Sequence, residues 1–229
     1  MNISGSQLRP ITQRAANEIV YDQVHAAISS GQFAPGQKLS TRKIAEELNV
    51  SQMPVREAFH RLVADGGLVR HGNRSMSIPV LSMVEFSDVT DVRIMLEGQA
   101  AAKAAQNVIP KNQLRKLLQI NEQLDDAVAA DDRIVHLTLN RNLHFGVYRQ
   151  SNSETLVNMI AQLWLRVGPL LRLNTTHKNS VLRSNYWHTT LVEALSVGDS
   201  EKARHAVEMD LKEAAVVVQK NWVAIGLED

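Results

Sequence analysis

The sequence predicts a mainly α-helical fold, with a small N-terminal domain that ends in a β-hairpin and a larger all-α antiparallel helical bundle. Aromatic residues are scarce, at 4% of the chain. Apolar residues recur at helical spacing along most of the 229 residues, and short segments rich in Gly, Asn, Asp and Pro separate these stretches. We expect the first domain to span residues 11–80 and the second to span residues 81–229.

The first two helices are expected between Thr12 and Leu48. The first should run from Thr12 to Ser30 and stop at Gly31, before a turn at Ala34-Pro35-Gly36. The second should begin after Ser40, whose hydroxyl is a suitable N-cap for a helix from Thr41 to Leu48. The residues of the first helix that should face inward are Val20, Val24, Ala27 and Ile28.

The stretch SQMPVREAFHRLV predicts a third helix with two different faces. Ser51 is placed to cap it, and Pro54 falls in the first turn, where the missing N–H costs nothing. Gln52, Arg56 and His60 follow one another at i, i+4 and i+8 on a polar face. The opposite stripe is apolar and consists of Val55, Ala58, Phe59, Leu62 and Val63.

Two short extended pieces follow the third helix. They cover Leu68–Arg70 and Met76–Val80, and His71-Gly72-Asn73-Arg74-Ser75 joins them. Met76, Ile78 and Val80 alternate with Ser77 and Pro79, which predicts a half-buried strand. Three helices followed by a hairpin make a winged helix-turn-helix.

In a winged helix-turn-helix the third helix enters the major groove of DNA. Arg56 can then pair in two points with guanine and Gln52 with adenine, while the helix N-terminus at Ser51 can receive a phosphate. A simpler interpretation is that the polar row is a solvated helix face. Residues 1–80 carry nine Lys and Arg against six Asp and Glu, a weak sign of a polyanionic partner. Further contacts to phosphate or the minor groove are expected from Arg42, Lys43, Arg70 and Arg74.

The N-terminal domain resembles the DNA-binding domain of the GntR family of bacterial transcription regulators. The matching motifs are I-x-x-G-x-x-x-P-G-x-x-L, I-A-x-x-L-x-V-S, P-V-R-E-A-x-x-R-L and G-x-L-V. The resemblance implies that Arg56 reads a guanine and that Arg42 also contacts DNA. The chain departs from the family at Ser51-Gln52, where S-R is usual, and in the wing, where HGNRS leaves Arg74 as the minor-groove probe.

The second domain reads as a run of helices with short loops. Ser82-Met83-Val84-Glu85 forms a capping box, and Pro110 is expected at the first position of a later helix. The expected helices cover 88–106, 111–130, 131–150, 154–173, 182–197 and 200–223, which predicts an all-α bundle.

The pieces VRIMLEGQAAAKAA, LNRNLHFGVYRQSNSETLVNMI and WHTTLVEALSVGDSEKARHAVEMDL resemble the FadR-type C-terminal effector domain in its six-helix, VanR-like version. That resemblance implies a bundle that binds a small carboxylate and often a divalent metal such as Zn, Ni or Mn. Asn140 stands where the family has Asp, and Asp210 stands where the family has His. Carried over position by position, the metal ligands are Asn140, His144, His188 and Asp210.

Two arginines are candidates for binding the carboxylate of an effector. Arg93 could hold it through a bidentate guanidinium pair, although a salt bridge with Glu97 is an equally good interpretation. Arg166 lies near Gly168-Pro169 and could line the cavity. The histidines have an ordinary alternative as well, because a lone buried His is commonly a hydrogen-bonded core residue.

Together these features predict a ligand-responsive, dimeric transcription regulator, a repressor that binds a pseudo-palindromic operator in double-stranded DNA. The alternative is a metal-dependent enzyme that uses the His/Asp cluster, but the chain has no H-E-x-x-H, G-x-S-x-G or Gly-rich phosphate motif. A DNA-binding module without a ligand would not need the second domain. The chain has no cysteine, no signal-peptide pattern and no membrane-length apolar run, so we expect a cytoplasmic protein without a membrane partner.

Overall fold

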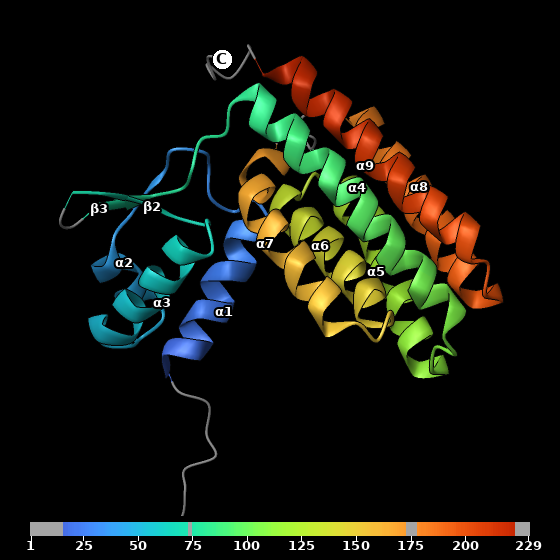
Figure 1. Cartoon of the computed structure of the whole chain (residues 1–229), viewed down its shortest axis with the longest axis horizontal. Coiled ribbons are helices and arrows are strands. Elements are labelled where there is room, and N and C mark those ends of the chain that lie inside the picture. Colours follow the sequence, from blue (N-terminus) through green and yellow to red (C-terminus); the bar gives the residue numbers. More distant parts are fainter. Residues whose placement is uncertain (1–15, 73–74, 173–177, 223–229) are drawn as a thin grey trace, which may run out of the picture.

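The computed structural model describes residues 16–72, 75–172 and 178–222, and within them it forms a small head and a long helical bundle (Figure 1). The head consists of α1 (Ala16–Ser29), β1 (Lys38–Leu39), α2 (Thr41–Glu47), α3 (Gln52–Ala64), β2 (Val69–His71) and β3 (Ser75–Ser77). The bundle consists of α4 (Met83–Gln106), α5 (Lys111–Ala129), α6 (Arg133–Arg149), α7 (Glu154–Leu171), α8 (Lys178–Val197) and α9 (Ser200–Asn221). The predicted fold class is confirmed.

The apolar stripe of α3 forms the centre of the head. Its residues Val55, Ala58, Phe59 and Leu62 are at most 2% exposed, and they pack with Val20, Val24 and Ile28 of α1. The predicted set of inward-facing residues of α1 is wrong at one position and misses another. Ala27 is only half-buried, whereas His25, which periodicity did not single out, is buried. The expected start of the first helix at Thr12 lies outside the described residues.

The head carries a small antiparallel sheet in the order β1-β3-β2. The predicted hairpin corresponds to β2 and β3, but β1 was missed because it is only two residues long and pairs with a distant strand. The predicted alternation across Met76–Val80 is wrong. Ile78 is 1% exposed and Val80 is 52% exposed, because β3 ends at Ser77 and the chain then leaves the sheet toward the bundle.

The bundle begins at the predicted capping box. Ser82 Oγ accepts a hydrogen bond from the Glu85 backbone N–H at 3.2 Å, and the Glu85 carboxylate accepts one from the Ser82 backbone N–H at 2.9 Å. Pro110 is the N-cap of α5 rather than its first helical residue. Helices α4 and α9 run side by side, with α8 packed against α9 and α5 against α6 (Figure 1).

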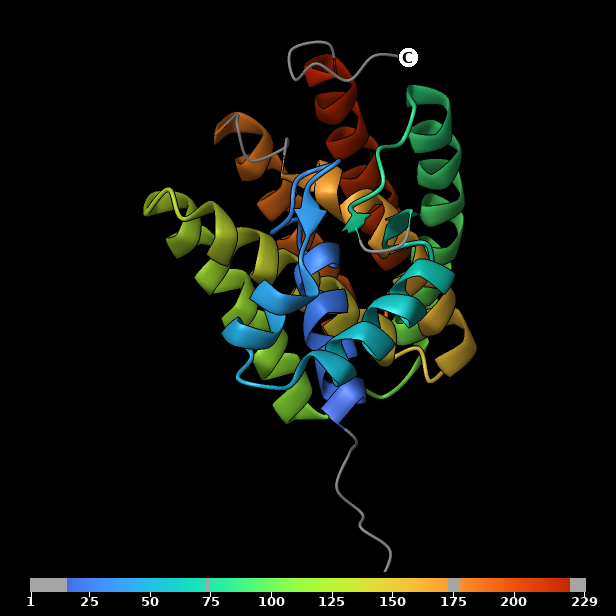
Figure 2. The same ribbon diagram turned by 90° about the vertical axis from the view of Figure 1, so that its left-hand side faces the viewer.

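The head is seated on α7 of the bundle, and Figure 2 shows it in front of the helices. Leu165 of α7 is fully buried and belongs to the apolar core of the head. Gly168 allows the backbones of α1 and α7 to approach closely, because a Cβ there would lie 2.5 Å from the carbonyl oxygen of Ile28. No helix in the described ranges is both long and apolar enough to cross a membrane.

Candidate functional site

Helix α3 exposes the polar face that the sequence predicts for DNA contact. Gln52, Arg56 and His60 are exposed on the side opposite the buried stripe. Ser51 is the N-cap of the helix but makes no side-chain capping hydrogen bond, so its hydroxyl does not occupy the amides of the first turn. A hollow of about 370 Å³ lies between α2 and α3 at this point, and Arg42 and Gln52 line it.

The other predicted DNA-contacting residues in the described ranges lie on α2 and β2. The Arg42 side chain is 72% exposed and lies 3.9 Å from Glu46, while Lys43 is exposed and its backbone N–H donates to Ser40 Oγ at 3.4 Å. Arg70 is exposed on β2, and its Nε donates to the carbonyl of Gly72 at 3.2 Å. Arg74 lies outside the described residues. These described side chains are therefore exposed, and the ion pair between Arg42 and Glu46 holds Arg42 only weakly.

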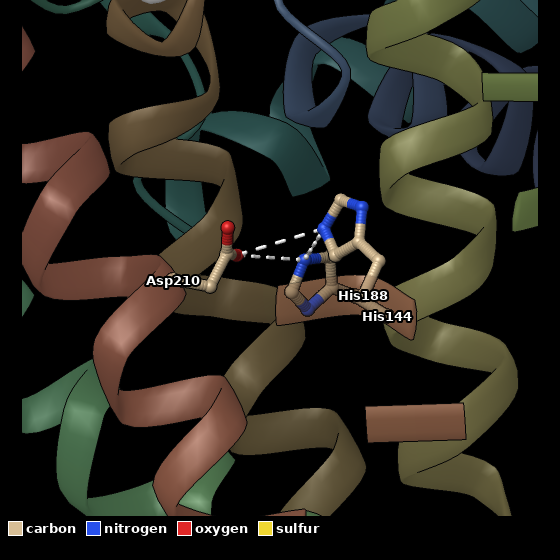
Figure 3. A group of neighbouring side chains, drawn as sticks. All are labelled: His144, His188 and Asp210. Carbon is tan, nitrogen blue, oxygen red and sulfur yellow. Dashed lines mark hydrogen bonds and ion pairs between the residues drawn. The ribbon is translucent and has the colours of Figure 1, made fainter. Parts of the chain in front are cut away.

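The bundle brings together three of the four predicted metal ligands. His144 of α6, His188 of α8 and Asp210 of α9 converge in the interior, and none of their side chains is more than 7% exposed (Figure 3). His144 Nε2 lies 3.2 Å from His188 Nε2 and 3.2 Å from Asp210 Oδ2. The distance from His188 Nε2 to Asp210 Oδ2 is 3.7 Å. Three different helices, α6, α8 and α9, therefore each contribute one donor atom.

The electrostatics of this cluster favour the protonation states that bind a cation. Burial raises the pKa of the Asp210 carboxyl, but the imidazoles of His188 and His144 outweigh it and hold that pKa below its usual range. Burial lowers the pKa of His188, and this outweighs the opposite effect of Asp210. An ionised carboxylate and a neutral imidazole are the forms that coordinate metal ions.

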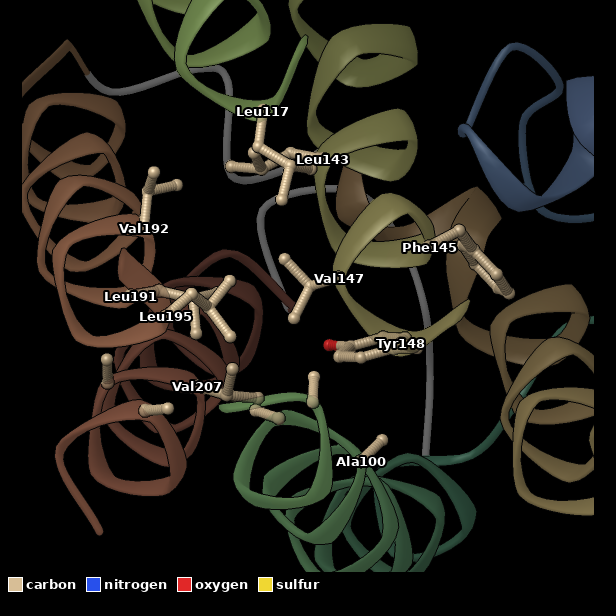
Figure 4. Packing of buried hydrophobic residues seen from close by; sticks show 14 of the residues in the cluster. Ala100, Leu117, Leu143, Phe145, Val147, Tyr148, Leu191, Val192, Leu195 and Val207 are labelled. Carbon is tan, nitrogen blue, oxygen red and sulfur yellow. The ribbon is translucent and has the colours of Figure 1, made fainter. Parts of the chain in front are cut away.

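A chain of buried hydrogen bonds supports His144 from behind. Tyr148 Oη donates to Glu97 Oε2 at 2.5 Å, so its oxygen accepts from His144 Nδ1, which lies 2.8 Å away. Glu97 Oε1 in turn accepts from Arg93 Nε at 2.7 Å. With the proton on Nδ1, the lone pair of His144 Nε2 faces His188 and Asp210. Figure 4 shows the side chains of Tyr148 and Phe145 on different sides of α6, and the Phe145 ring packs against Trp164 of α7.

The spacing of the three donor atoms fits a divalent metal ion. Donors about 2.0–2.1 Å from one tetrahedral ion are separated from each other by about 3.4 Å, and the observed separations are 3.2 to 3.7 Å. The cluster could therefore bind a metal ion with little rearrangement. Asn140, the fourth predicted ligand, is half-buried one turn before His144 on α6 and makes no hydrogen bond to the other three.

The two predicted effector residues lie in different environments. Arg93 is 4% exposed and pairs with Glu97, as the alternative interpretation had it, and its guanidinium lies 4.8 Å from the ring centre of Trp164. Arg166 is 36% exposed and lies 4.0 Å from Glu85 at the start of α4. Only Arg93 is connected through hydrogen bonds among the described residues to the His144 cluster. The supporting role of Tyr148 was missed, although its i, i+4 spacing from His144 was visible in the sequence.

Comparison with known families matches each of the two parts. Residues 16–78 match the family described as "Bacterial regulatory proteins, gntR family", and residues 88–213 match the FCD domain. The FCD match alone covers more than half of the chain.

Individual relatives agree with these matches. The chain is 32% identical over 198 residues to the HTH-type transcriptional regulator McbR of Escherichia coli K12, which covers 85% of this chain and 89% of that protein. It is 26% identical to a probable D-xylose utilization operon transcriptional repressor of Paenarthrobacter nicotinovorans, with 86% of each chain covered.

Solved structures agree with the observed fold. The structure of E. coli McbR/YncC covers 92% of this chain with a TM-score of 0.85 and 27% identity. The relatives are transcription regulators, so the alternative of a metal-dependent enzyme is not supported. The chain belongs to the GntR family of bacterial regulatory proteins and is a DNA-binding transcription regulator with an FCD domain.

Proposed function

We propose that this regulator is a cytoplasmic dimeric repressor whose operator affinity changes when a small organic acid binds inside the FCD bundle. One observation carries the proposal. A buried, cation-compatible cluster at His144, His188 and Asp210 and an exposed polar face on α3 occur in two separate parts of one chain. The two parts meet along α7, so a change in the bundle can reach the head.

The DNA-binding role rests on the exposed residues at the start of α3. Arg56 supplies the guanidinium that pairs with guanine, and Gln52 supplies an amide for adenine. Ser51 and the first amides of the helix receive a phosphate, while Arg42, Lys43, Arg70 and Arg74 contact the backbone around it. A half-site of a few base pairs is too weak alone, so we propose that two heads, held together by their bundles, read a pseudo-palindrome.

The effector site is proposed beside the buried cluster. Arg93 is the better candidate for the effector carboxylate, because Glu97 and Tyr148 connect it to His144. Arg166 would contribute only from the surface. Asn121 adds a polar group in this interior, since it donates to Thr189 at 2.9 Å and its Oδ1 has no hydrogen-bond partner among the described residues.

The residues that would hold a divalent ion are His144, His188 and Asp210. Asn140 would add a fourth ligand through its amide oxygen. Such an ion would supply a fixed positive charge and open positions for the oxygens of the organic acid. Two imidazoles and one carboxylate are compatible with Zn, Ni or Mn. Tyr148 would keep His144 in the tautomer that presents Nε2 to the ion.

The test is a selection of bound sequences from randomised DNA duplexes, followed by operator titrations with and without divalent metal and a panel of small carboxylates. We expect a two-fold symmetric site, and a loss of affinity in the presence of one of the acids. Arg115→Ala, which removes an exposed arginine of α5, is the control for general charge effects. Selection of no defined sequence by the wild-type protein would contradict the proposal.

A further inference from the structure

The head and the bundle enclose a cleft that the proposed effector site does not use. Helix α1 rests on α7 and stands over α6, with a cleft of about 910 Å³ on one side and one of about 320 Å³ on the other. The larger cleft is lined by residues of α1, α3, α6 and α7. Any molecule bound there would contact the DNA-binding head and the bundle at once.

Two arginines and an aromatic ring form one wall of this larger cleft. Arg141, Phe145 and Arg149 follow one another at i, i+4 and i+8 on α6. The guanidinium of Arg141 lies 4.6 Å from the ring centre of Phe145, and that of Arg149 lies 5.9 Å from it. Both guanidinium groups therefore lie within the distance typical of cation–π contacts with the Phe145 ring.

The positive charge of Arg141 is poorly compensated. Its Nε is buried and has no hydrogen-bond partner among the described residues. The exposed Arg149 lies on the same face of α6 and adds a second positive charge. Neither arginine forms an ion pair with a described carboxylate within 4.0 Å. A buried donor without an acceptor is costly, so a negatively charged ligand would be favoured beside Arg141.

Asp22, Asp65 and Glu154 also line the cleft, and none of these carboxylates forms an ion pair with Arg141 or Arg149 within 4.0 Å. Asp65 accepts a hydrogen bond from Tyr21 Oη at 2.6 Å and lies 3.9 Å from Arg61. Ser153, the N-cap of α7, lines the opposite wall of the cleft and makes no side-chain capping hydrogen bond. The start of α7 therefore lies at this wall, at the positive end of the helix dipole, and the exposed Glu154 carboxylate lies there as well.

We propose that this cleft binds a small oxyanion, a carboxylate or a phosphate group, between Arg141, Arg149 and the start of α7. The fork of Arg141 would supply paired donors, and Arg149 would supply a second charge from the rim. The group attached to the oxyanion would lie against the ring of Phe145. This site is separate from the metal cluster, although α6 carries both, since His144 faces the bundle interior and the Arg141 stripe faces the cleft.

We expect anion binding in this cleft to change the position of the DNA-binding head relative to the bundle. A ligand in the cleft contacts α1 and α3 as well as α6 and α7, so it favours the arrangement in which these surfaces are close. If DNA binding requires a different arrangement, the anion and the operator oppose each other by the same factor in both directions. The cleft would then be a second regulatory input that does not depend on the metal cluster.

The test uses the full-length protein after chelator treatment, titrated by calorimetry with inorganic phosphate and, separately, with citrate. Chloride at matched ionic strength is the reference. We expect saturable binding of at least one of the two oxyanions, weakened at least tenfold by Arg149→Gln and by Arg141→Lys. The exposed Arg115→Gln on α5 is the matched control and should bind as the wild type does. Which oxyanion binds distinguishes a phosphorylated ligand from a carboxylic acid.

The variants differ in their risk to the fold. Arg149 is exposed, so its replacement should leave the thermal midpoint unchanged, and it carries the test even if Arg141→Lys is destabilised. Absence of saturable binding of both oxyanions to the wild-type protein would overturn the proposal. Binding that persists at wild-type strength in Arg149→Gln and in a folded Arg141→Lys would overturn it as well. Because no metal is present, either result leaves the proposed metal site untouched.

Discussion

Tyr148 Oη lies 2.8 Å from Nδ1 of His144 and determines which nitrogen of that imidazole faces the buried cluster. The hydroxyl proton goes to Glu97, so the Tyr148 oxygen accepts the Nδ1 proton of His144. Nε2 of His144 is left with its lone pair toward His188 and Asp210. We therefore expect metal binding by the cluster to depend on Tyr148, which is not itself a ligand.

Replacing Tyr148 by Phe should weaken metal binding without removing a donor atom. Loss of such a supporting hydrogen bond typically lowers metal affinity about 10–100-fold. Competition against a chelating dye measures this affinity directly. Tyr186→Phe is a matched control, because Tyr186 is 63% exposed on α8. Equal metal affinities of Tyr148→Phe and the wild type would show that His144 does not need this anchor.

Replacing Asn140 by Asp should strengthen cation binding. The change replaces a neutral amide by an anionic oxygen one helical turn from His144, and harder divalent ions prefer carboxylate over amide oxygen. Metal competition for Mn and Zn would report the change. Asn142→Asp, at an exposed position of α6, adds the same charge away from the cluster. The same gain in both variants would mean that net charge, and not coordination by residue 140, is responsible.

Replacing Arg56 by Ala should weaken operator binding by about 1–3 kcal/mol and relax the preference at one base pair of each half-site. Arg42→Ala should weaken binding equally for all DNA sequences, because phosphate contacts carry no base preference. It should also reduce the salt dependence of binding, because one phosphate contact is lost. Titrations over a salt series separate the two effects. An Arg56→Ala protein with unchanged operator affinity and sequence preference would contradict the assignment of α3 as the recognition helix.

Replacing Gly168 by Ala should loosen the joint between head and bundle. The added Cβ would lie 2.5 Å from the carbonyl oxygen of Ile28 and 2.7 Å from Cα of Ser29, and backbone atoms cannot move aside cheaply. Overpacking of this kind costs about 1–3 kcal/mol. In Gly146→Ala the close atom is the flexible Leu117 side chain, so the thermal midpoint should fall less. Equal thermal midpoints of Gly168→Ala and Gly146→Ala would show that the fold does not require the close approach of α1 and α7.

Stability should fall as the pH drops from about 6.5 to 4, and His25 should contribute to this. Burial, followed by Arg141, lowers the pKa of His25 from its ordinary 6.5 to about 4, against the opposite effects of Asp65 and Asp22. The folded protein thus binds this proton more weakly than the unfolded chain, and up to about 3 kcal/mol of stability is lost across that window.

Denaturant unfolding at pH 7 and pH 4.5 measures this contribution. His25→Gln should lose less stability between the two pH values than the wild type, while the exposed His60→Gln should behave as the wild type does. The comparison isolates His25, since buried His136, whose pKa burial also lowers to about 4, is present in all three proteins. An unchanged pH dependence in His25→Gln would contradict the assignment.

Local chemistry made much of this fold predictable. The stripe from Val55 to Leu62 is buried as its spacing requires, and the Ser82–Glu85 capping box begins α4. Such features depend on residues within a few positions of each other, where helix geometry fixes the neighbours. The metal cluster was predictable in a different way, because only the family resemblance placed His144, His188 and Asp210 in one site.

Features that depend on contacts between distant elements were not predictable. Strand β1 has two residues and exists only because β3 pairs with it. Leu165 reads as part of an ordinary bundle helix, yet it completes the core of the head. The cleft beside Arg141 arises from how α1 rests on α7, and no periodicity within α6 indicates it. Docking of one domain on another is determined by shape across both surfaces.

The most direct test of a ligand-controlled regulator with a metal-binding bundle is the metal content of the reconstituted protein, measured together with its operator affinity. Wild type, His188→Ala and the nearly isosteric Asp210→Asn would be loaded with Zn, Ni or Mn, dialysed and analysed for metal. We expect the wild type to retain one of these ions and both variants to lose it, while all three bind the operator alike without effector. Metal retention that is equal in all three proteins, or a wild-type protein that remains metal-free and yet responds fully to its effector, would contradict the account.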